Sequence, residues 1–153
     1  NLVKDHIKIE AVIIGRGLLK KELINYINRN HLSNFVKVRN FVSNPYPLIK
    51  QTELFILSSK YEGLPNVLLE ALTLKKFVIS SNCSTGPKEI LLNGKGGILF
   101  KVGDYKQLAK KIKYYYQNKQ ICQKLLNNSF EGLKRFDAMK NLNEYLLLIK
   151  SIN

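Results

Sequence analysis

The sequence has few of the residues that build metal and redox sites. It contains two cysteines and two histidines among 153 residues. Cys83 and Cys122 lie far apart and lack the C-x-x-C spacing of zinc and redox sites. His6 and His31 stand alone, without a second histidine at the i, i+4 spacing typical of zinc ligation. We therefore expect no metal and no other cofactor, and two free thiols in a reducing compartment.

Long apolar runs are absent as well. No run approaches the roughly 20 residues that a membrane-spanning helix needs. Residues 1–5 lack the basic-then-apolar layout of a signal peptide. The hydrophobic fraction of 45% and the charged fraction of 24% are typical of a globular protein. We expect a cytoplasmic protein and, from its length, one domain over residues 1–153.

Acidic residues are scarce, with 11 against 25 basic ones and a net charge of +14. Such an excess suggests an anionic partner, whereas the alternative is a compositional bias, since lysine and asparagine recur along the whole chain. No helix-turn-helix, zinc finger or aromatic-studded sheet motif is present, so we expect no nucleic-acid binding. Lys110, Lys111 and Lys113 lie close enough together for peripheral contact with the anionic inner face of a membrane.

Short apolar runs alternate with longer helical patterns. This alternation predicts an α/β fold, a doubly wound parallel sheet with helices on both faces, in the manner of a Rossmann-like domain. The run 54–57 is continuously apolar, as expected for a strand covered on both faces. Folds of this type bind ligands at the carboxyl ends of their strands. We expect strands near 9–14, 35–38, 54–57 and 77–79, and a turn and strand over 96–100. Helices are expected near 18–30, 65–74 and 87–92, with a short one that begins at 48–49. Asp104 is expected to cap a helix that runs to about residue 118, and residues 121–149 to be mostly helical with interruptions near Gly132 and Phe136.

The segment 62–70 follows the third of these runs and enters a helix. Gly63 allows the backbone to approach a ligand closely, and Pro65 suits the first turn of a helix, whose free N–H groups favour an anion. Glu70 lies about one turn further on, near enough to accept hydrogen bonds from ribose hydroxyls. The alternative is that Asn66 and Glu70 only form the solvent-facing side of an amphipathic helix.

Glu62 and Glu70, with seven residues between them that include Gly-Leu-Pro-Asn, resemble the donor-site signature of the retaining glycosyltransferases of family 4 (glycosyl transferases group 1). A lone pair of glutamates would be weak evidence, but the likeness continues in register over about residues 9 to 140. It therefore implies the nucleotide-sugar-binding half of a GT-B fold. The further segments that match are 12–17, 41–46, 70–72, 77–81, 86–91 and 94–104.

The resemblance implies a role for each matching residue. Glu62 would contact the donor sugar near the reacting centre as the catalytic residue, and Glu70 would bind the ribose hydroxyls. Members of this family usually work without a metal. The other residues implied to bind the donor are Gly15 and Gly17 beside the nucleotide, Phe41 and Val42 against the base, and the backbone of Gly63, Leu64, Pro65 and Asn66 around the sugar and distal phosphate.

The implied reaction moves a sugar, with retention, from a nucleotide diphosphate sugar to a glycan or lipid-linked acceptor in polysaccharide biosynthesis. Asn66 and the run 83–87 are most similar to enzymes that build surface polysaccharides and glycan precursors, which often use UDP-hexoses or UDP-N-acetylhexosamines. The resemblance therefore implies a hexosyltransferase. A dehydrogenase is the weaker alternative, because Lys20 occupies the third glycine position of a dinucleotide loop that would start at Gly15.

Some positions depart from the family pattern. Arg16 stands where an acidic residue is common, and Asn40 where a glycine is common. The family's donor domain opens with a strand and loop that carry an Arg and a Lys for the diphosphate, after an N-terminal acceptor domain, and residues 1–153 contain neither. The alternative to an enzyme is therefore a non-catalytic nucleotide-binding module or a remnant.

Overall fold

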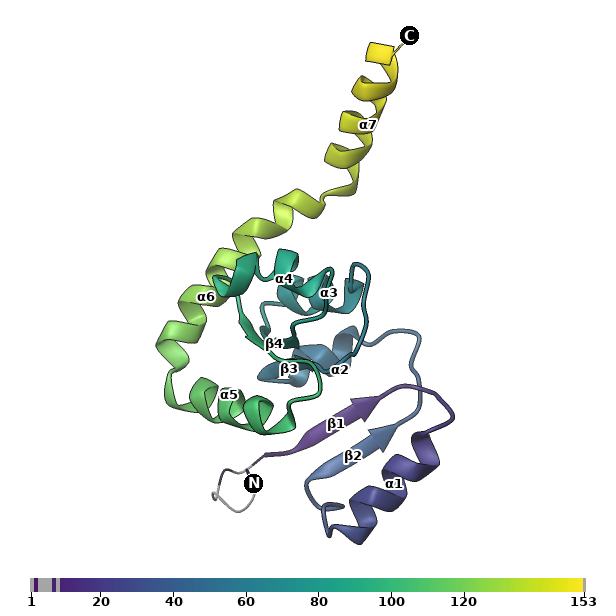
Figure 1. The fold of residues 1–153 in the computed structure, drawn as a ribbon, viewed down its shortest axis with the longest axis vertical. Helices are drawn as coiled ribbons and strands as arrows, with labels where there is room; N and C mark the ends of the chain where they lie inside the picture. The colour runs from purple at the N-terminus through teal and green to yellow at the C-terminus, as the bar shows by residue number, and fades with distance from the viewer. Residues whose placement is uncertain (1, 3–6, 8, 153) are drawn as a thin grey trace. The chain divides into compact units, whose positions relative to one another are not determined.

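The computed structural model describes residues 2, 7 and 9–152 and is shown in Figure 1. His6 and most of residues 1–5, discussed above, lie outside the described residues. The chain divides into two compact units, Asn1–Pro47 and Leu48–Asn153, where the sequence predicted one domain. Each unit is an α/β assembly with its own parallel sheet.

The first unit is a β-α-β unit with two parallel strands. Its elements are β1 (Ala11–Ile14), α1 (Lys20–Arg29) and β2 (Val36–Arg39). The strands pair in register from Ala11 with Val36 to Ile14 with Arg39, and α1 supplies the crossover that a parallel pair requires. Burial is shallow, because Val12 and Ile13 are each 41% exposed.

The second unit holds a three-stranded parallel sheet in the order β3-β4-β5. Its register runs from Leu54 opposite Phe77 and from Ile79 opposite Ile98. The elements, with α2 crossing the boundary between the units, are α2 (Tyr46–Gln51), β3 (Leu54–Leu57), α3 (Asn66–Thr73), β4 (Phe77–Ser81), α4 (Pro87–Ile90), the 3-10 helix η1 (Leu92–Gly94), β5 (Ile98–Phe100), α5 (Tyr105–Gln117), α6 (Lys119–Gly132), the 3-10 helix η2 (Leu133–Phe136) and α7 (Ala138–Ile152).

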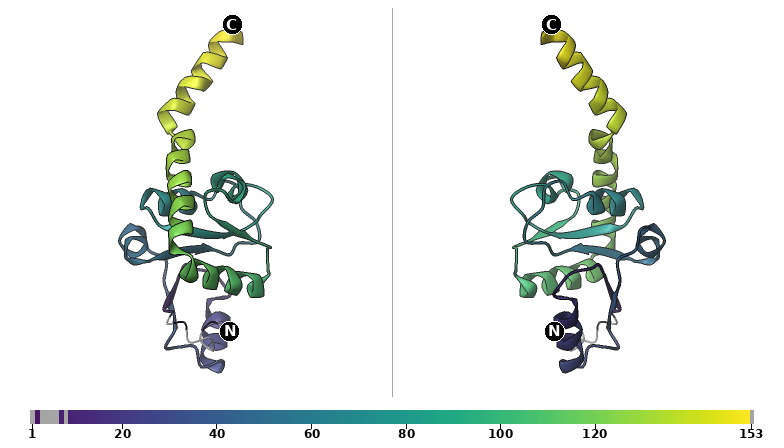
Figure 2. Two further views of the ribbon diagram at one scale, coloured as in Figure 1. Left: turned by 90° about the vertical axis from the view of Figure 1, so that its left-hand side faces the viewer. Right: turned by 90° about the vertical axis from the view of Figure 1, so that its right-hand side faces the viewer.

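The core of this unit forms around β4, the central strand, in which all five residues are buried. Within the unit, α3 and α4 lie on one face of the sheet and α5 on the other (Figures 1 and 2). On the α5 side, Phe77 stacks on Tyr115 with ring centroids 5.1 Å apart. On the α3 side, Leu68 and Leu72 are fully buried. Helices on both faces of a parallel sheet confirm the predicted α/β class.

The edge strand β3 is less covered than its sequence predicts. Ile56 is 39% exposed and the other three residues are half-buried, so the prediction of a strand covered on both faces is wrong here. The reason is position: among the described residues β3 pairs only with β4, which leaves one side of it without a neighbour. A continuous apolar run identifies a strand but not its place in the sheet.

Candidate functional site

The segment predicted to bind the donor lies at the carboxyl end of β3. It runs from Ser58 through a loop into α3, which begins at Asn66. Within it Gly63 is exposed, Leu64 is 49% exposed and Pro65 is buried. The loop therefore presents the backbone around Gly63 and Leu64 at the edge of the sheet where parallel α/β folds bind ligands.

The first turn of α3 has no cap. Pro65 occupies the N-cap position, one residue before the helix, and no side chain accepts a hydrogen bond from the first turn. The sequence predicted Pro65 inside that turn, so the helix begins one residue later than expected. The N–H groups of Gly63, Leu64 and Asn66 donate to no other residue that the structure describes. Uncapped N–H groups at a helix start are suited to hold an anion or a hydroxyl oxygen.

The carboxylates of Glu62 and Glu70 are also unpaired. Both residues are half-buried, and neither carboxylate takes part in a hydrogen bond or ion pair with a described residue. Glu70 lies one turn beyond Asn66 on the same side of α3, about 6 Å along the helix axis. Along the chain, two unpaired carboxylates thus lie on either side of free N–H donors, and groups of these two kinds can bind hydroxyls and an anion respectively.

A second segment, residues 81–86 at the end of β4 and just after it, holds this loop by hydrogen bonds. The Ser81 hydroxyl donates to the carbonyl oxygen of Ser59 at 2.7 Å, and the Cys83 thiol donates to the same oxygen at 3.2 Å. The Thr85 hydroxyl donates to the carbonyl oxygen of Glu62 at 2.5 Å. No role could be predicted for these side chains from the sequence, since a hydroxyl that bonds a distant backbone carbonyl leaves no periodic pattern.

Gly86 brings this second segment into direct contact with the loop. Its φ of 83° lies in the left-handed region that favours glycine. A Cβ atom at this position would lie 2.0 Å from the carbonyl oxygen of Gly63 and 2.5 Å from Cδ of Pro65. Only glycine fits, so the close approach of the two segments depends on the residue type at position 86.

The remaining predicted residues gather in the first unit. Gly15 and Gly17 follow β1, and Phe41 and Val42 follow β2, so both pairs lie at the carboxyl ends of adjacent strands. The Gly15 N–H donates to the Arg39 carbonyl oxygen at 3.3 Å.

Basic side chains accompany the exposed ring of Phe41. The guanidinium carbon of Arg16 lies 5.2 Å from the centroid of the Phe41 ring, which is 58% exposed. Lys20 donates a hydrogen bond to the Asn40 side chain. The two positions that depart from the family pattern, Arg16 and Asn40, are thus in contact with basic or aromatic side chains of this unit. An exposed aromatic ring with a guanidinium beside it is suited to stack a nucleotide base.

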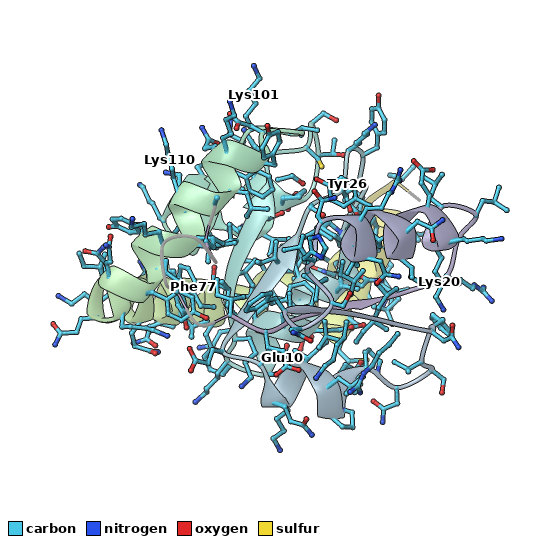
Figure 3. The ribbon with its side chains drawn as sticks, turned by 90° about the horizontal axis from the view of Figure 1, so that it is seen from below. Glu10, Lys20, Tyr26, Phe77, Lys101 and Lys110 are labelled. Carbon is cyan, nitrogen blue, oxygen red and sulfur yellow. The ribbon has the colours of Figure 1, made fainter. Side chains whose placement is uncertain are left out.

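Other features of the described residues bear on cofactors and membranes. Among the described residues, no group of three or more His, Cys, Asp or Glu side chains could hold a metal ion. Nor does this part of the chain contain a helix with the length and hydrophobicity to cross a bilayer. Lys101 and Lys110 extend outward from the second unit (Figure 3). Both side chains are exposed, whereas Lys111 is half-buried.

Two open concavities, of about 430 and 590 Å³, lie beside β5 and α5 and contain none of the residues predicted to bind the donor. The first is lined by Asn82, Phe100 and Lys101 among others, and the second by α5 lysines such as Lys106 and Lys110. The first gathers residues at the ends of β4 and β5 with Gln107 of α5, and the second is lined by α5 and its N-cap Asp104. The chemistry of the α3 loop is the stronger indicator of a site than these hollows.

Comparison with known proteins agrees with this arrangement. The family model described as "Glycosyl transferases group 1" matches residues 1–132, which include both carboxyl-end loops and α3. The chain belongs to this glycosyltransferase family. An uncharacterized glycosyltransferase of Methanocaldococcus jannaschii is 34% identical over 170 residues, covering 92% of this chain and 42% of that protein.

Other relatives carry more specific names. A Campylobacter jejuni N-acetylgalactosamine-N,N'-diacetylbacillosaminyl-diphospho-undecaprenol 4-alpha-N-acetylgalactosaminyltransferase is 28% identical, covering 86% of this chain and 36% of that protein. Among solved structures, HepE of Anabaena in complex with UDP superimposes with a TM-score of 0.84 at 25% identity, covering 94% of this chain and 41% of that one.

TarM has the same fold, with a TM-score of 0.84 at 22% identity over 96% of this chain and 30% of its own. These neighbours place the chain in the α/β, Rossmann-like part of the GT-B fold. The chain spans about two fifths of the length of the curated relatives it matches, 42%, 36% and 39% for three of them.

Proposed function

We propose that this chain is the donor-binding half of a retaining, family 4 hexosyltransferase. The donor would be a UDP-hexose or UDP-N-acetylhexosamine, and the acceptor a glycan or a lipid-linked glycan. One observation carries the proposal: the free N–H groups at the start of α3 are flanked by the unpaired carboxylates of Glu62 and Glu70. This arrangement matches the two halves of a sugar nucleotide, an anionic diphosphate and neutral hydroxyls.

The roles follow from the chemistry of each group. The N–H groups around Gly63 and Leu64 would bind the distal phosphate and stabilise the charge that develops on the leaving diphosphate. Glu70 would accept hydrogen bonds from the ribose hydroxyls, and Glu62 would contact the sugar at the reacting carbon. In the first unit, the Phe41 ring and Val42 would hold the base, and Gly15 and Gly17 would admit the nucleotide. Backbone donors and basic side chains would take the part that a metal plays in other transferases.

The names of relatives support the donor and the acceptor class. HepE of Anabaena was solved with UDP and with UDP-glucose. The Campylobacter relative named above transfers N-acetylgalactosamine to a diphospho-undecaprenol glycan, and a Staphylococcus aureus relative is a poly(ribitol-phosphate) alpha-N-acetylglucosaminyltransferase. A lipid-linked acceptor would place the enzyme in the cytoplasm, peripherally on the inner face of the membrane.

We further propose that the active enzyme contains an acceptor domain and one more strand than residues 1–153 provide. Among the described residues, β1 pairs only with β2 and β3 only with β4, so each sheet has an unpaired edge there. No residue of α7 is buried, although much of it is apolar. Its exposed apolar residues are Met139, Leu142, Tyr145, Leu146, Leu147, Leu148, Ile149 and Ile152. An apolar surface of this kind normally packs against another part of the protein.

The second candidate is a nucleotide-binding module without turnover. Both candidates require nucleotide binding, and they differ only in whether a sugar is transferred.

Calorimetric titration of the chain with UDP, GDP and ADP tests what the two candidates share. We expect UDP to bind more tightly than the other two, and a Glu70→Ala variant to lose most of that affinity. Glu131→Ala, which changes an exposed carboxylate of α6, is the matched control and should bind as the parent does. Equal or undetectable binding of all three nucleotides would contradict the proposal.

A further inference from the structure

We propose that Thr85, together with Ser81 and Cys83, positions the loop from Ser59 to Pro65. In this role Thr85 orients the N–H groups of the loop toward the ligand. These are positioning residues and need not touch the substrate. The inference rests on the function proposed above, because the loop is assigned there to the sugar and distal phosphate. It assigns a task to three side chains that the family resemblance leaves without one.

The start of the loop is fixed by two buried donors that share one acceptor. Ser81 is fully buried and Cys83 is 3% exposed. Their hydroxyl and thiol both donate to the carbonyl oxygen of Ser59, which can accept two hydrogen bonds. Because these donors come from the end of the central strand β4, the beginning of the loop is tied to the most buried element of the unit.

The orientation of the next peptide follows from the Thr85 hydrogen bond. The carbonyl of Glu62 and the N–H of Gly63 belong to one planar peptide unit, and in a trans peptide they point in opposite directions. The Thr85 hydroxyl holds the carbonyl oxygen of Glu62 on its own side. The N–H of Gly63 must therefore point away from the second segment, toward a side where no described residue accepts it.

The following peptide is oriented in the same sense by Gly86. A Cβ on Gly86 would lie 2.0 Å from the carbonyl oxygen of Gly63, so this oxygen also faces the second segment. The N–H of Leu64, in the same peptide unit, points away from it. Two successive N–H groups thus point to the same open side, next to the uncapped start of α3. Two N–H groups that point to one side of the chain can donate to the same anionic group.

Thr85 is the residue at which this inference can be tested without unfolding the protein. Its side chain is exposed, whereas Ser81 and Cys83 lie in the core. Thr85→Val removes the hydroxyl and keeps the shape, and Thr85→Ser restores a hydroxyl. Ser84→Ala, which removes the neighbouring exposed hydroxyl, is the matched control.

Two measurements on the whole chain are needed: the UDP dissociation constant, and the backbone 15N order parameters of Gly63 and Leu64 without ligand. We expect Thr85→Val to weaken UDP binding about 3- to 10-fold and to lower both order parameters. Thr85→Ser should stay within about twofold of the parent, and Ser84→Ala should not change either quantity.

The outcomes separate this inference from the function on which it rests. If the parent binds UDP and Thr85→Val matches it in affinity and in both order parameters, the positioning role is wrong. If the order parameters fall in Thr85→Val but the parent binds no nucleotide, Thr85 does position the loop and the proposed function is wrong. Loss of binding in Ser84→Ala as large as in Thr85→Val would also overturn the inference, because it would make the effect unspecific.

Discussion

Helices α3 and α5 both begin after a strand of the same sheet, yet only α5 has a side chain that caps its first turn. At α5 the carboxylate of Asp104 accepts the N–H of Gln107 at 2.8 Å, as the sequence predicted for a capping aspartate. The side chain of Gln107 in turn accepts the N–H of Lys101 at 2.6 Å. At α3 the N-cap is Pro65, whose carbonyl oxygen accepts the N–H of Leu68 at 2.9 Å but whose side chain has no acceptor for the other N–H groups of the first turn.

We interpret the difference as one between a helix start that is capped for stability and one whose donors are left free for the proposed ligand. A capping side chain typically stabilises a helix by about 1 kcal/mol, and α5 has one. The first turn of α3 lacks this contribution and leaves its donors free beside two unpaired glutamates. An anion site is expected to have free N–H groups at a helix start and a loop that is fixed by neighbouring residues. The start of α3 has both features.

The largest expected effect compares two glycines, one in contact with the loop before α3 and one just before α5. Gly86 packs against the α3 loop and Gly103 lies just before the α5 cap, and both have positive φ angles, of 83° and 78°. An alanine at either position is strained, but only at position 86 does its Cβ clash with backbone. We expect a loss of unfolding free energy of roughly 2–5 kcal/mol for Gly86→Ala and about 1–2 kcal/mol for Gly103→Ala.

Urea denaturation of both variants, followed by circular dichroism, measures this difference. The open space around Gly103, where no atom lies within 4 Å of the added Cβ, makes it a control for backbone strain alone. Equal losses of unfolding free energy in the two variants would mean that the close contact between Gly86 and the loop has no effect on stability.

A second prediction concerns the acceptor on α3. Glu70→Gln keeps the shape of the side chain and removes its charge, so it should weaken charge-assisted hydrogen bonds to the ribose hydroxyls. We expect the affinity for UDP to fall about 10- to 100-fold, because hydrogen bonds to charged groups contribute about 1.5–3 kcal/mol. Calorimetry gives the affinity directly, and an unchanged value would assign Glu70 to the solvent-facing side of an ordinary amphipathic helix.

A third prediction gives α3 the kind of cap that α5 has. In Pro65→Ser, the new hydroxyl can accept the N–H of Val67, the second residue of α3, so that this N–H group of the first turn is no longer free for the ligand. We expect UDP affinity to fall about tenfold, equivalent to about 1.4 kcal/mol. Pro65→Ala, which removes the ring without adding an acceptor, is the control for lost packing. If the two variants bind UDP equally, competition for the N–H groups is not the cause.

The smallest effect is expected at α5. Asp104→Ala removes the cap and should lower the free energy of unfolding by about 1 kcal/mol. Nucleotide affinity should stay the same, because the ligand is assigned to α3. A thermal melt and a UDP titration of the same sample measure both quantities. A loss of UDP affinity in this variant would remove the contrast between the two helix starts.

The sequence predicted the elements of this fold well. All five strands and the main helices lie where apolar periodicity placed them, and Asp104 caps α5 as expected. Periodicity depends on neighbours within a few residues, so it reports which element forms. It does not report which strand lies at an edge, and for that reason the prediction of full cover was wrong for Ile56.

The support of the α3 loop could not be predicted in this way. Ser81, Cys83 and Thr85 bond carbonyl oxygens that lie 22 to 24 residues earlier in the chain. Backbone carbonyls are present at every residue, so no residue type at the accepting position marks the contact. The positive φ of Gly86 was equally invisible, because glycine also occurs where the backbone is unstrained, and only the fold brings position 86 against Gly63.

The central claim is that the first turn of α3, and not that of α5, binds the nucleotide sugar. Amide NMR of the chain during titration with UDP-glucose tests it most directly. We predict saturable shifts at Gly63, Leu64, Asn66 and Glu70, with the amides of Tyr105 and Lys106 unchanged. Shifts of equal size at both helix starts, or none at the start of α3 under conditions of saturation, would contradict the account.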